Sequence, residues 1–229
     1  MKLTAIHQIE ITSRCNLRCR YCAHPQMARK KEDMDAATFA KALSVAETLH
    51  KQHGHCELNL CGIGESTLHP MFVEFMKLAR FTMPRSVDII LATNGIGWTP
   101  ELAEQIAILN GGRGKVRIWV SLHRPEKAGP TVELLRRVGL LAGVSADPSV
   151  AAVNWAGQVD YHVSAPRTEC PWLAQGWGFV MADGRIGTCC FDGAGVDGVL
   201  GTIWDNVSSF DVKPYSLCPE CHHTYKEKP

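Results

Sequence analysis

The sequence predicts an α/β fold in which a partial β/α barrel of five or six strands is followed by a small cysteine-rich region with a β-hairpin. Over the first two-thirds of the 229 residues, short runs rich in β-branched residues alternate with amphipathic stretches, which is the pattern of parallel β/α units. This part, 1–166, is too short for a full barrel of eight units. In 167–229, glycine-rich turns replace the long helices, so we place a domain boundary between the two parts.

Four β/α units follow one another in the first part. The expected strands are 5–12, 55–61, 86–93 and 116–122. The expected helices are 35–51, 71–81, 100–110 and 131–142. Asp35 is a candidate N-cap, and Thr99 precedes Pro100 at a first helical position. Two further short strands are expected at 150–155 and 159–164.

The carboxyl ends of these strands indicate where the chemistry lies, because the active site of a β/α barrel forms where the loops after the strands converge. Four segments follow the four strands: 13–22, 62–66, 93–95 and 121–124. We therefore expect these segments to lie side by side.

The overall composition excludes several classes of function. Lys and Arg number 24 against 23 for Asp and Glu, which gives a net charge of +1 and no basic excess for binding a phosphate backbone. The first residues contain no apolar signal-peptide core, and no stretch approaches the roughly 18 apolar residues of a membrane span. We expect a cytoplasmic protein with neither a nucleic-acid nor a membrane partner.

Ten cysteines are the unusual feature of the composition. In a reducing cytosol, metal ligation or thiol chemistry explains so many cysteines better than disulfides do. Cys15, Cys19 and Cys22 follow the first strand with the spacing C-x-x-x-C-x-x-C. Three thiolates on one loop can hold an iron–sulfur cluster whose fourth iron stays open, and a zinc site or three buried thiols are the alternatives.

This segment, with its Cys-Asn-Leu-Arg-Cys core and the aromatic Tyr21 before the third cysteine, closely resembles the radical S-adenosylmethionine (SAM) superfamily. The resemblance implies a TIM-like partial barrel and a [4Fe–4S] cluster whose open iron chelates SAM. Reductive cleavage of SAM would then give methionine and a 5′-deoxyadenosyl radical, which takes a hydrogen atom from the substrate. Tyr21 would lie near the adenine.

The loops after the other strands fit the same resemblance. Gly62-Ile63-Gly64-Glu65 is similar to the GGE element of the family, which binds the methionyl amino group, with Ser66 in place of the usual proline. The further SAM contacts that the resemblance implies are Thr93, Asn94 and Ser121.

Two residues at the barrel mouth are candidates for catalysis. His123 stands where related enzymes often carry an acidic residue, and it is either a substrate contact or base, or a histidine with satisfied hydrogen bonds. Cys61, directly before the Gly62 loop, is either a hydrogen-atom donor to a substrate radical or a small buried residue.

Five cysteines lie in the C-terminal region: Cys170, Cys189, Cys190, Cys218 and Cys221. Their spacing alone fits either zinc or an iron–sulfur cluster. The region resembles the twitch extension of radical SAM enzymes, the short form of the SPASM type, which implies one auxiliary [4Fe–4S] cluster. The implied ligands are Cys170, Cys189, Cys218 and Cys221, with Cys189 favoured over Cys190 by the family's G-x-x-x-x-C element, which begins at Gly184.

Among relatives with one auxiliary cluster, so short a chain looks most like the aminocyclitol alcohol dehydrogenase class. We therefore expect oxidation of an alcohol carbon, with the auxiliary cluster accepting an electron. A radical SAM enzyme that epimerises, cross-links or oxidises a peptide is the alternative, and a non-catalytic iron–sulfur or zinc protein is a more remote one. The expected partners are SAM, a small-molecule or peptide substrate, and an electron donor such as flavodoxin or ferredoxin.

Overall fold

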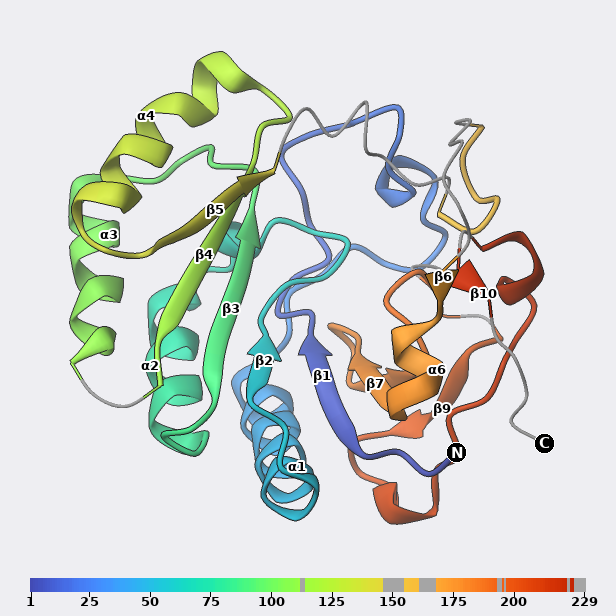
Figure 1. Cartoon of the computed structure of the whole chain (residues 1–229). Coiled ribbons are helices and arrows are strands. Elements are labelled where there is room, and N and C mark those ends of the chain that lie inside the picture. Colours follow the sequence, from blue (N-terminus) through green and yellow to red (C-terminus); the bar gives the residue numbers. More distant parts are fainter. Residues whose placement is uncertain are drawn as a thin grey trace.

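The structure, a computed structural model, describes residues 1–111, 114–145, 155–160, 168–192, 195, 197–221 and 223–224. Its main feature is one eight-stranded sheet with the strand order β5-β4-β3-β2-β1-β7-β8-β9 (Figure 1). The first five strands, which pair in parallel, are β1 (Ala5–Ile9), β2 (Glu57–Asn59), β3 (Asp88–Thr93), β4 (Val116–Ser121) and β5 (Leu141–Ser145). This parallel sheet confirms the expected α/β class with a partial barrel.

The C-terminal strands extend the same sheet. β7 (Trp177–Val180) pairs in parallel with β1, whereas β8 (Arg185–Gly187) and β9 (Val199–Thr202) continue antiparallel. β6 (Thr168–Glu169) and β10 (His223–Thr224) form a separate two-stranded sheet. β7–β9 and β1–β5 thus share one sheet. The domain boundary between residues 166 and 167 stays a prediction.

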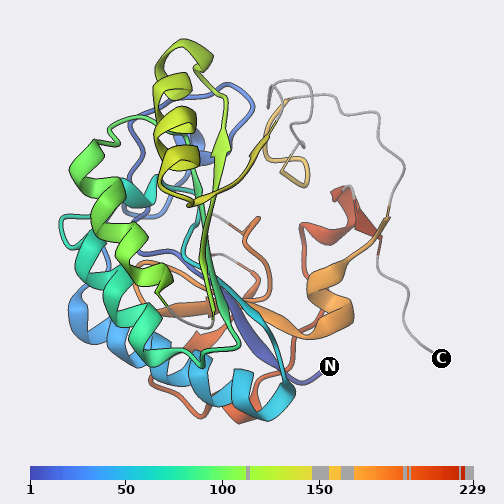
Figure 2. The same cartoon turned by 60° about the vertical axis from the view of Figure 1, so that its left-hand side comes forward.

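Four helices cover the outer face of the parallel strands (Figures 1 and 2). They are α1 (Ala36–His53), α2 (Phe72–Thr82), α3 (Pro100–Ala107) and α4 (Pro125–Arg137), and α6 (Pro171–Gln175) lies before β7. Short 3₁₀ turns occupy His24–Gln26, Ser66–Leu68, Ile108–Asn110, Val207–Ser209 and Cys218–Glu220. The expected caps are present, because Asp35 accepts a hydrogen bond from the Thr38 amide and Thr99 from the Leu102 amide. Among the described residues, we find no helix that combines the length and apolarity needed to span a membrane.

The two faces of the sheet differ in composition. In β4 the side chains of Val116, Ile118 and Val120 are buried under the helices, while Arg117 and Trp119 between them are exposed on the inner face. The core beneath the helices includes Phe39 of α1 stacked on Phe75 of α2, with ring centroids 4.0 Å apart. The helices thus anchor the strands, and the inner face remains free to line the site.

The fourth expected helix was wrong at both ends. α4 begins at Pro125 and contains Pro130, a residue that is unfavourable in a helix interior, so the sequence misleadingly indicated a start after it. The helix ends at Arg137, and Gly139, with φ of 76°, directs the chain into β5. The apolar run 140–144 has no periodicity that separates a strand from a buried helix.

The two strands expected at 150–155 and 159–164 lie mostly outside the described residues. The described part, 155–160, forms a turn rather than strands. Trp155, Ala156 and Gly157 have φ values of 51°, 55° and 81°, which a strand does not allow.

His7 on β1 gives the fold a predicted pH dependence. Its ring stacks on Trp177 of β7 with centroids 3.9 Å apart, and Asn59 Nδ2 lies 3.1 Å from its Nε2. Burial, together with the neighbouring His50 and His55, lowers the pKa of His7 from 6.5 to about 4. As the pH falls below about 6.5, the unfolded chain binds this proton first, so stability is lost progressively between pH 6.5 and 4.

We expect the loss attributable to His7 to reach up to about 3 kcal/mol at pH 4, seen as a falling thermal unfolding midpoint. His7→Phe keeps a ring against Trp177 but removes the titrating group, so its midpoint should fall less steeply with pH. Identical slopes for the two proteins would show that His7 does not cause the loss.

Candidate active site

A cavity of about 380 Å³ lies at the carboxyl ends of the parallel strands. Its wall brings together all ten residues predicted to hold the first cluster and SAM: Cys15, Cys19, Tyr21, Cys22, Gly62, Gly64, Glu65, Thr93, Asn94 and Ser121. Both candidate catalytic residues, Cys61 and His123, are also in the wall. The four loops therefore converge, as expected for the loops that follow the strands of a β/α barrel. The roles of the individual residues stay predictions.

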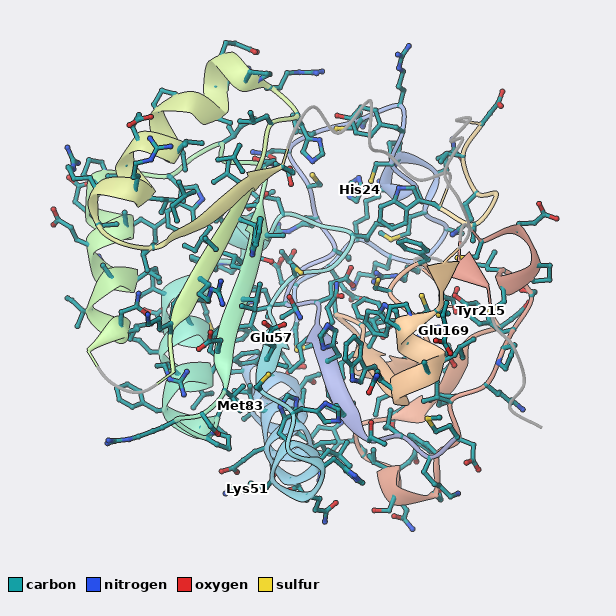
Figure 3. The ribbon with its side chains drawn as sticks, in the orientation of Figure 1. His24, Lys51, Glu57, Met83, Glu169 and Tyr215 are labelled. Carbon is teal, nitrogen blue, oxygen red and sulfur yellow. The ribbon has the colours of Figure 1, made fainter. Side chains whose placement is uncertain are left out.

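The three N-terminal cysteines lie on the long loop between β1 and α1, the cluster loop (10–35). The two ends of this loop are hydrogen-bonded to each other, with the Ser13 amide 2.9 Å from Glu32 O and the Met34 amide 2.8 Å from Ile11 O. The buried His24, labelled in Figure 3, places its Nε2 3.0 Å from Ser13 O. These bonds hold the base of the loop, so that its outer part presents the thiols to the cavity.

The environment of these thiols suits metal ligation. Backbone amides of Leu17 and His24 point at the sulfurs of Cys15 and Cys22, each at 3.4 Å. Burial raises the pKa of Cys15 and raises that of Cys22 to about 11, so neither thiol ionises readily on its own near neutral pH. A bound metal replaces the proton and stabilises the thiolate.

The loop after β2 packs directly on the cluster loop, and this close approach requires glycine. A Cβ on Gly62 would lie 2.3 Å from Cγ of Glu10, and one on Gly64 would lie 2.3 Å from the Thr12 carbonyl. The Glu65 amide, in turn, donates to Arg14 O at 2.7 Å. Backbone groups of the Gly62 loop are thereby held at the cavity wall.

The carboxylate of Glu65 accepts hydrogen bonds from other residues of the protein. The side chain is buried and accepts hydrogen bonds from the hydroxyls of Thr67 and Thr93, both at 2.8 Å, and from the Asn94 amide at 2.7 Å. Asn94 Nδ2 donates in turn to Asn16 of the cluster loop at 2.7 Å. The carboxylate therefore fixes the loop after β3 against the Gly62 loop, and Asn94 links both to the cluster loop.

Tyr21 and His123 form a pair across the cavity mouth. The Tyr21 hydroxyl lies 2.9 Å from Nδ1 of His123, which follows β4. Trp155, a lining residue that the sequence did not indicate, donates from its indole to Tyr21 O at 3.1 Å. The residue predicted near the adenine is thus held by groups from two distant parts of the chain.

A buried ion pair behind the loops of the site was not predicted from the sequence. Glu10 is fully buried at the end of β1, and its carboxylate oxygens lie 2.7 and 2.5 Å from Arg29 Nη2. The same carboxylate accepts from the Ile63 amide at 3.0 Å and the Ala182 amide at 3.2 Å. Glu10 therefore links the cluster loop, the Gly62 loop and the C-terminal hairpin.

A second, smaller cavity of about 70 Å³ lies in the C-terminal region. All five C-terminal cysteines line it: Cys170, Cys189, Cys190, Cys218 and Cys221. Gly184, with φ of 84°, turns the chain between β7 and β8 and so brings Cys189 to this wall. Tyr215, labelled in Figure 3, also lines this cavity.

Cys189 and Cys190 are distinguished by their environment. A hydrogen bond between the two thiols lowers the pKa of Cys189 and raises that of Cys190. The Phe191 amide also lies 3.4 Å from the Cys189 sulfur. The choice of Cys189 over Cys190 as the ligand stays a prediction.

The donor sets of both cavities fit iron–sulfur clusters. All ten cysteines are free thiols, and thiolates are the ligands that such clusters require. Within the described residues, no three His, Cys, Asp or Glu side chains are grouped around a point where they could hold a single metal ion. Each thiolate of a four-iron cluster binds a different iron, so a cluster needs more widely spaced sulfurs than one ion does.

Comparison with curated proteins gives relatives that match part of this chain. The tungsten-containing aldehyde ferredoxin oxidoreductase cofactor-modifying protein of Pyrococcus furiosus is 33% identical over 158 residues, which cover 67% of this chain and 40% of that protein. PqqA peptide cyclase of Ruegeria pomeroyi is 33% identical over 131 residues, 57% of this chain and 30% of the cyclase. The chain thus spans less than half the length of these relatives.

Solved structures share the fold over most of the chain. The structure of BtrN in complex with AdoMet, which is SAM, and 2-DOIA superposes with a TM-score of 0.74 at 18% identity, covering 92% of this chain and 85% of that one. Native anSMEcpe with bound AdoMet gives a TM-score of 0.59 at 16% identity, covering 87% and 78%. The sequence model of the radical SAM superfamily matches residues 9–165, and this chain belongs to that superfamily.

Proposed function

We propose that this radical SAM enzyme oxidises an alcohol carbon of a small molecule and uses a second cluster as the electron acceptor. The observation that carries the proposal is the pair of cysteine-lined cavities in one short chain, the larger at the barrel mouth and the smaller after the β7–β8 hairpin. The structure of BtrN, which has the same fold, contains AdoMet and the small ligand 2-DOIA, and this supports a small-molecule substrate.

Membership of the family implies SAM and one [4Fe–4S] cluster, for which Cys15, Cys19 and Cys22 are the proposed ligands. When bound, the cluster and SAM supply the reductive cleavage that yields methionine and a 5′-deoxyadenosyl radical able to take a hydrogen atom. We propose that Cys170, Cys189, Cys218 and Cys221 hold the auxiliary cluster. When bound, this cluster would supply a one-electron acceptor. An alcohol that gives up one hydrogen atom, one proton and one electron would become a carbonyl compound.

The chain's own residues would position the reactants and take the proton. Gly62 and Gly64 let the loop that would bind SAM pack closely on the cluster loop, and Glu65 holds Thr93 and Asn94 at the end of β3 by hydrogen bonds. The pair of Tyr21 and His123 accepts one proton, either directly on the imidazole or through the tyrosine hydroxyl to Nδ1. We assign the role of general base to His123 within this pair.

The auxiliary cluster is tested by the double variant Cys218→Ala/Cys221→Ala. Anaerobic reconstitution should give about eight irons per wild-type chain and about four in the variant. The variant should still form 5′-deoxyadenosine with dithionite, because the first cavity is intact, but should yield no product two mass units lighter than a cyclitol or aminocyclitol substrate. Cys190→Ala is the matched control and should keep about eight irons. Full iron in the double variant, or continued oxidation, would contradict the proposal.

The base is tested by His123→Ala. We expect the rate of carbonyl product formation to fall about 10²- to 10⁴-fold, while dithionite-driven formation of 5′-deoxyadenosine without substrate changes little. Tyr21→Phe, which keeps the ring but removes the hydroxyl, should give a smaller loss. An equal loss of both products in His123→Ala would mean that His123 acts on SAM binding instead.

A second candidate function is peptide modification, and Cys61 is the observation that favours it. Burial raises the pKa of Cys61 to about 12, so this thiol in the cavity wall keeps the hydrogen that a substrate radical would need. PqqA peptide cyclase is among the relatives, and anSMEcpe has been crystallised with AdoMet and a Cp18Cys peptide. If the enzyme epimerises a peptide, Cys61→Ala should stop turnover without loss of iron, whereas alcohol oxidation should survive this change.

A further inference from the structure

A third cavity, of about 440 Å³, lies next to the SAM cavity, between the cluster loop and the segment that joins β4 to α4. Three arginines line it: Arg18 and Arg20 on either side of Cys19, and Arg124 just before α4. All three are exposed, and its lining contains no acidic residue. We call this cavity the arginine groove.

The charges of the arginine groove are not neutralised within the described part of the chain. No Asp or Glu there forms an ion pair with Arg18, Arg20 or Arg124, although Arg124 Nη1 donates to the His123 carbonyl at 3.1 Å. Other exposed cations do pair locally, as Lys51 does with Glu47 and Arg136 with Glu133. With a net charge of only +1 over the whole chain, the groove is a local concentration of positive charge.

The groove shares a wall with the SAM cavity. Cys19, Tyr21 and His123 line both. A molecule in the arginine groove would therefore contact Cys19, a proposed ligand of the cluster, without entering the space proposed for SAM. Each reductive cleavage of SAM needs one electron, and that electron has to reach the cluster from outside.

From this geometry we propose that the arginine groove is the docking surface for an acidic electron-donor protein. The proposal rests on the proposed function, since it requires a cluster on Cys19. The reduced donor is oxidised by one electron, and the cluster is reduced by one electron through the Cys19 side of the groove. Acidic side chains of the donor complement Arg18, Arg20 and Arg124.

The test compares two reductants of opposite charge. Reduced flavodoxin serves as the acidic protein donor, and reduced methyl viologen serves as a small cationic donor that arginines do not attract. The variant is Arg18→Gln/Arg20→Gln/Arg124→Gln, and the control is Lys77→Gln/Lys115→Gln/Arg137→Gln. The control removes the same number of exposed positive charges from residues outside all three cavities. The measured quantity is the initial rate of 5′-deoxyadenosine formation at a limiting concentration of the donor. It is measured at low and at high ionic strength.

At low ionic strength we expect the groove variant to be about tenfold slower than wild type with flavodoxin and equal to wild type with methyl viologen. Its flavodoxin rate should also depend less on salt, whereas the control should behave like wild type. An unchanged flavodoxin rate would overturn the proposal. Equal losses with both donors would overturn it as well, because the arginines would then serve an anionic substrate or the folding of the loop. A wild-type protein that is inactive with methyl viologen would instead reject the proposed function.

Discussion

Alanine in place of Cys19 will abolish the formation of 5′-deoxyadenosine, with a loss of at least about 10³-fold relative to wild type. Cys19 lies on the outer part of the cluster loop, between Arg18 and Arg20, and it lines the same cavity as Cys15 and Cys22. Two remaining thiolates cannot complete a site that needs three, so the first cluster should be lost. The iron content of the reconstituted chain should fall from about eight to about four.

The matched control for this change is Cys56→Ala. Cys56 is exposed and does not line any of the three cavities, so its loss should alter neither the iron content nor the product. Similar iron and similar 5′-deoxyadenosine in Cys19→Ala and wild type would mean that the thiols of the cluster loop do not hold the cluster. A fall of the iron content in both variants would mean that loss of any cysteine impairs reconstitution, so that the effect is not specific to the cluster loop.

Alanine in place of Glu10 will destabilise the protein by about 3–5 kcal/mol, the usual cost of removing one partner of a buried ion pair. The change deprives buried Arg29 of two hydrogen bonds and leaves the amides of Ile63 and Ala182 without their acceptor. For a chain of this size, the thermal unfolding midpoint should fall by about 10 °C. The Gly62 loop and the cluster loop should also separate, so the yield of cluster reconstitution should fall.

An exposed ion pair provides the comparison for Glu10. Glu133 and Arg136 pair on the surface of α4, where solvent screens the interaction, so Glu133→Ala should leave the unfolding midpoint nearly unchanged. Glu10→Gln keeps one carbonyl acceptor and should lie between Glu10→Ala and wild type. If Glu10→Ala unfolds at the same temperature as Glu133→Ala, the ion pair does not stabilise the site.

The sequence predicted the elements of the fold where local signals are strong. The N-cap at Asp35 and the Thr99-Pro100 start located α1 and α3 well. α4 was displaced because a proline inside a helix and an apolar run without periodicity both gave ambiguous signals. The sharing of one sheet by β1 and β7 was not predictable either, since nothing local to Trp177–Val180 specifies its partner.

In the candidate site, too, local sequence signals predicted some features and missed others. The spacing of Cys15, Cys19 and Cys22 and their place after a strand were sufficient to predict where the cavity forms. The pairing of Glu10 with Arg29 was missed, because burial of a carboxylate directly after a strand is decided by residues distant in the sequence. The only sequence signal was a glutamate in the otherwise largely apolar run that leads into the cysteine loop.

Glu65 lies where the sequence predicted, but its side chain has a structural role that the sequence did not predict. The glycine-rich loop placed it at the cavity wall, as expected. Its carboxylate also accepts hydrogen bonds from Thr67 of the same loop, from Thr93 at the end of β3 and from Asn94 of the loop after β3. Sequence spacing predicts which loops meet, but side-chain hydrogen bonds depend on how those loops pack.

Formation of 5′-deoxyadenosine by the wild-type chain tests most directly whether this protein cleaves SAM. The protein should be reconstituted anaerobically with iron and sulfide and then incubated with SAM and dithionite, with the product quantified by chromatography and mass spectrometry. We predict 5′-deoxyadenosine and methionine in equal amounts from a protein that carries about eight irons. A protein that carries this iron but releases no 5′-deoxyadenosine would contradict it.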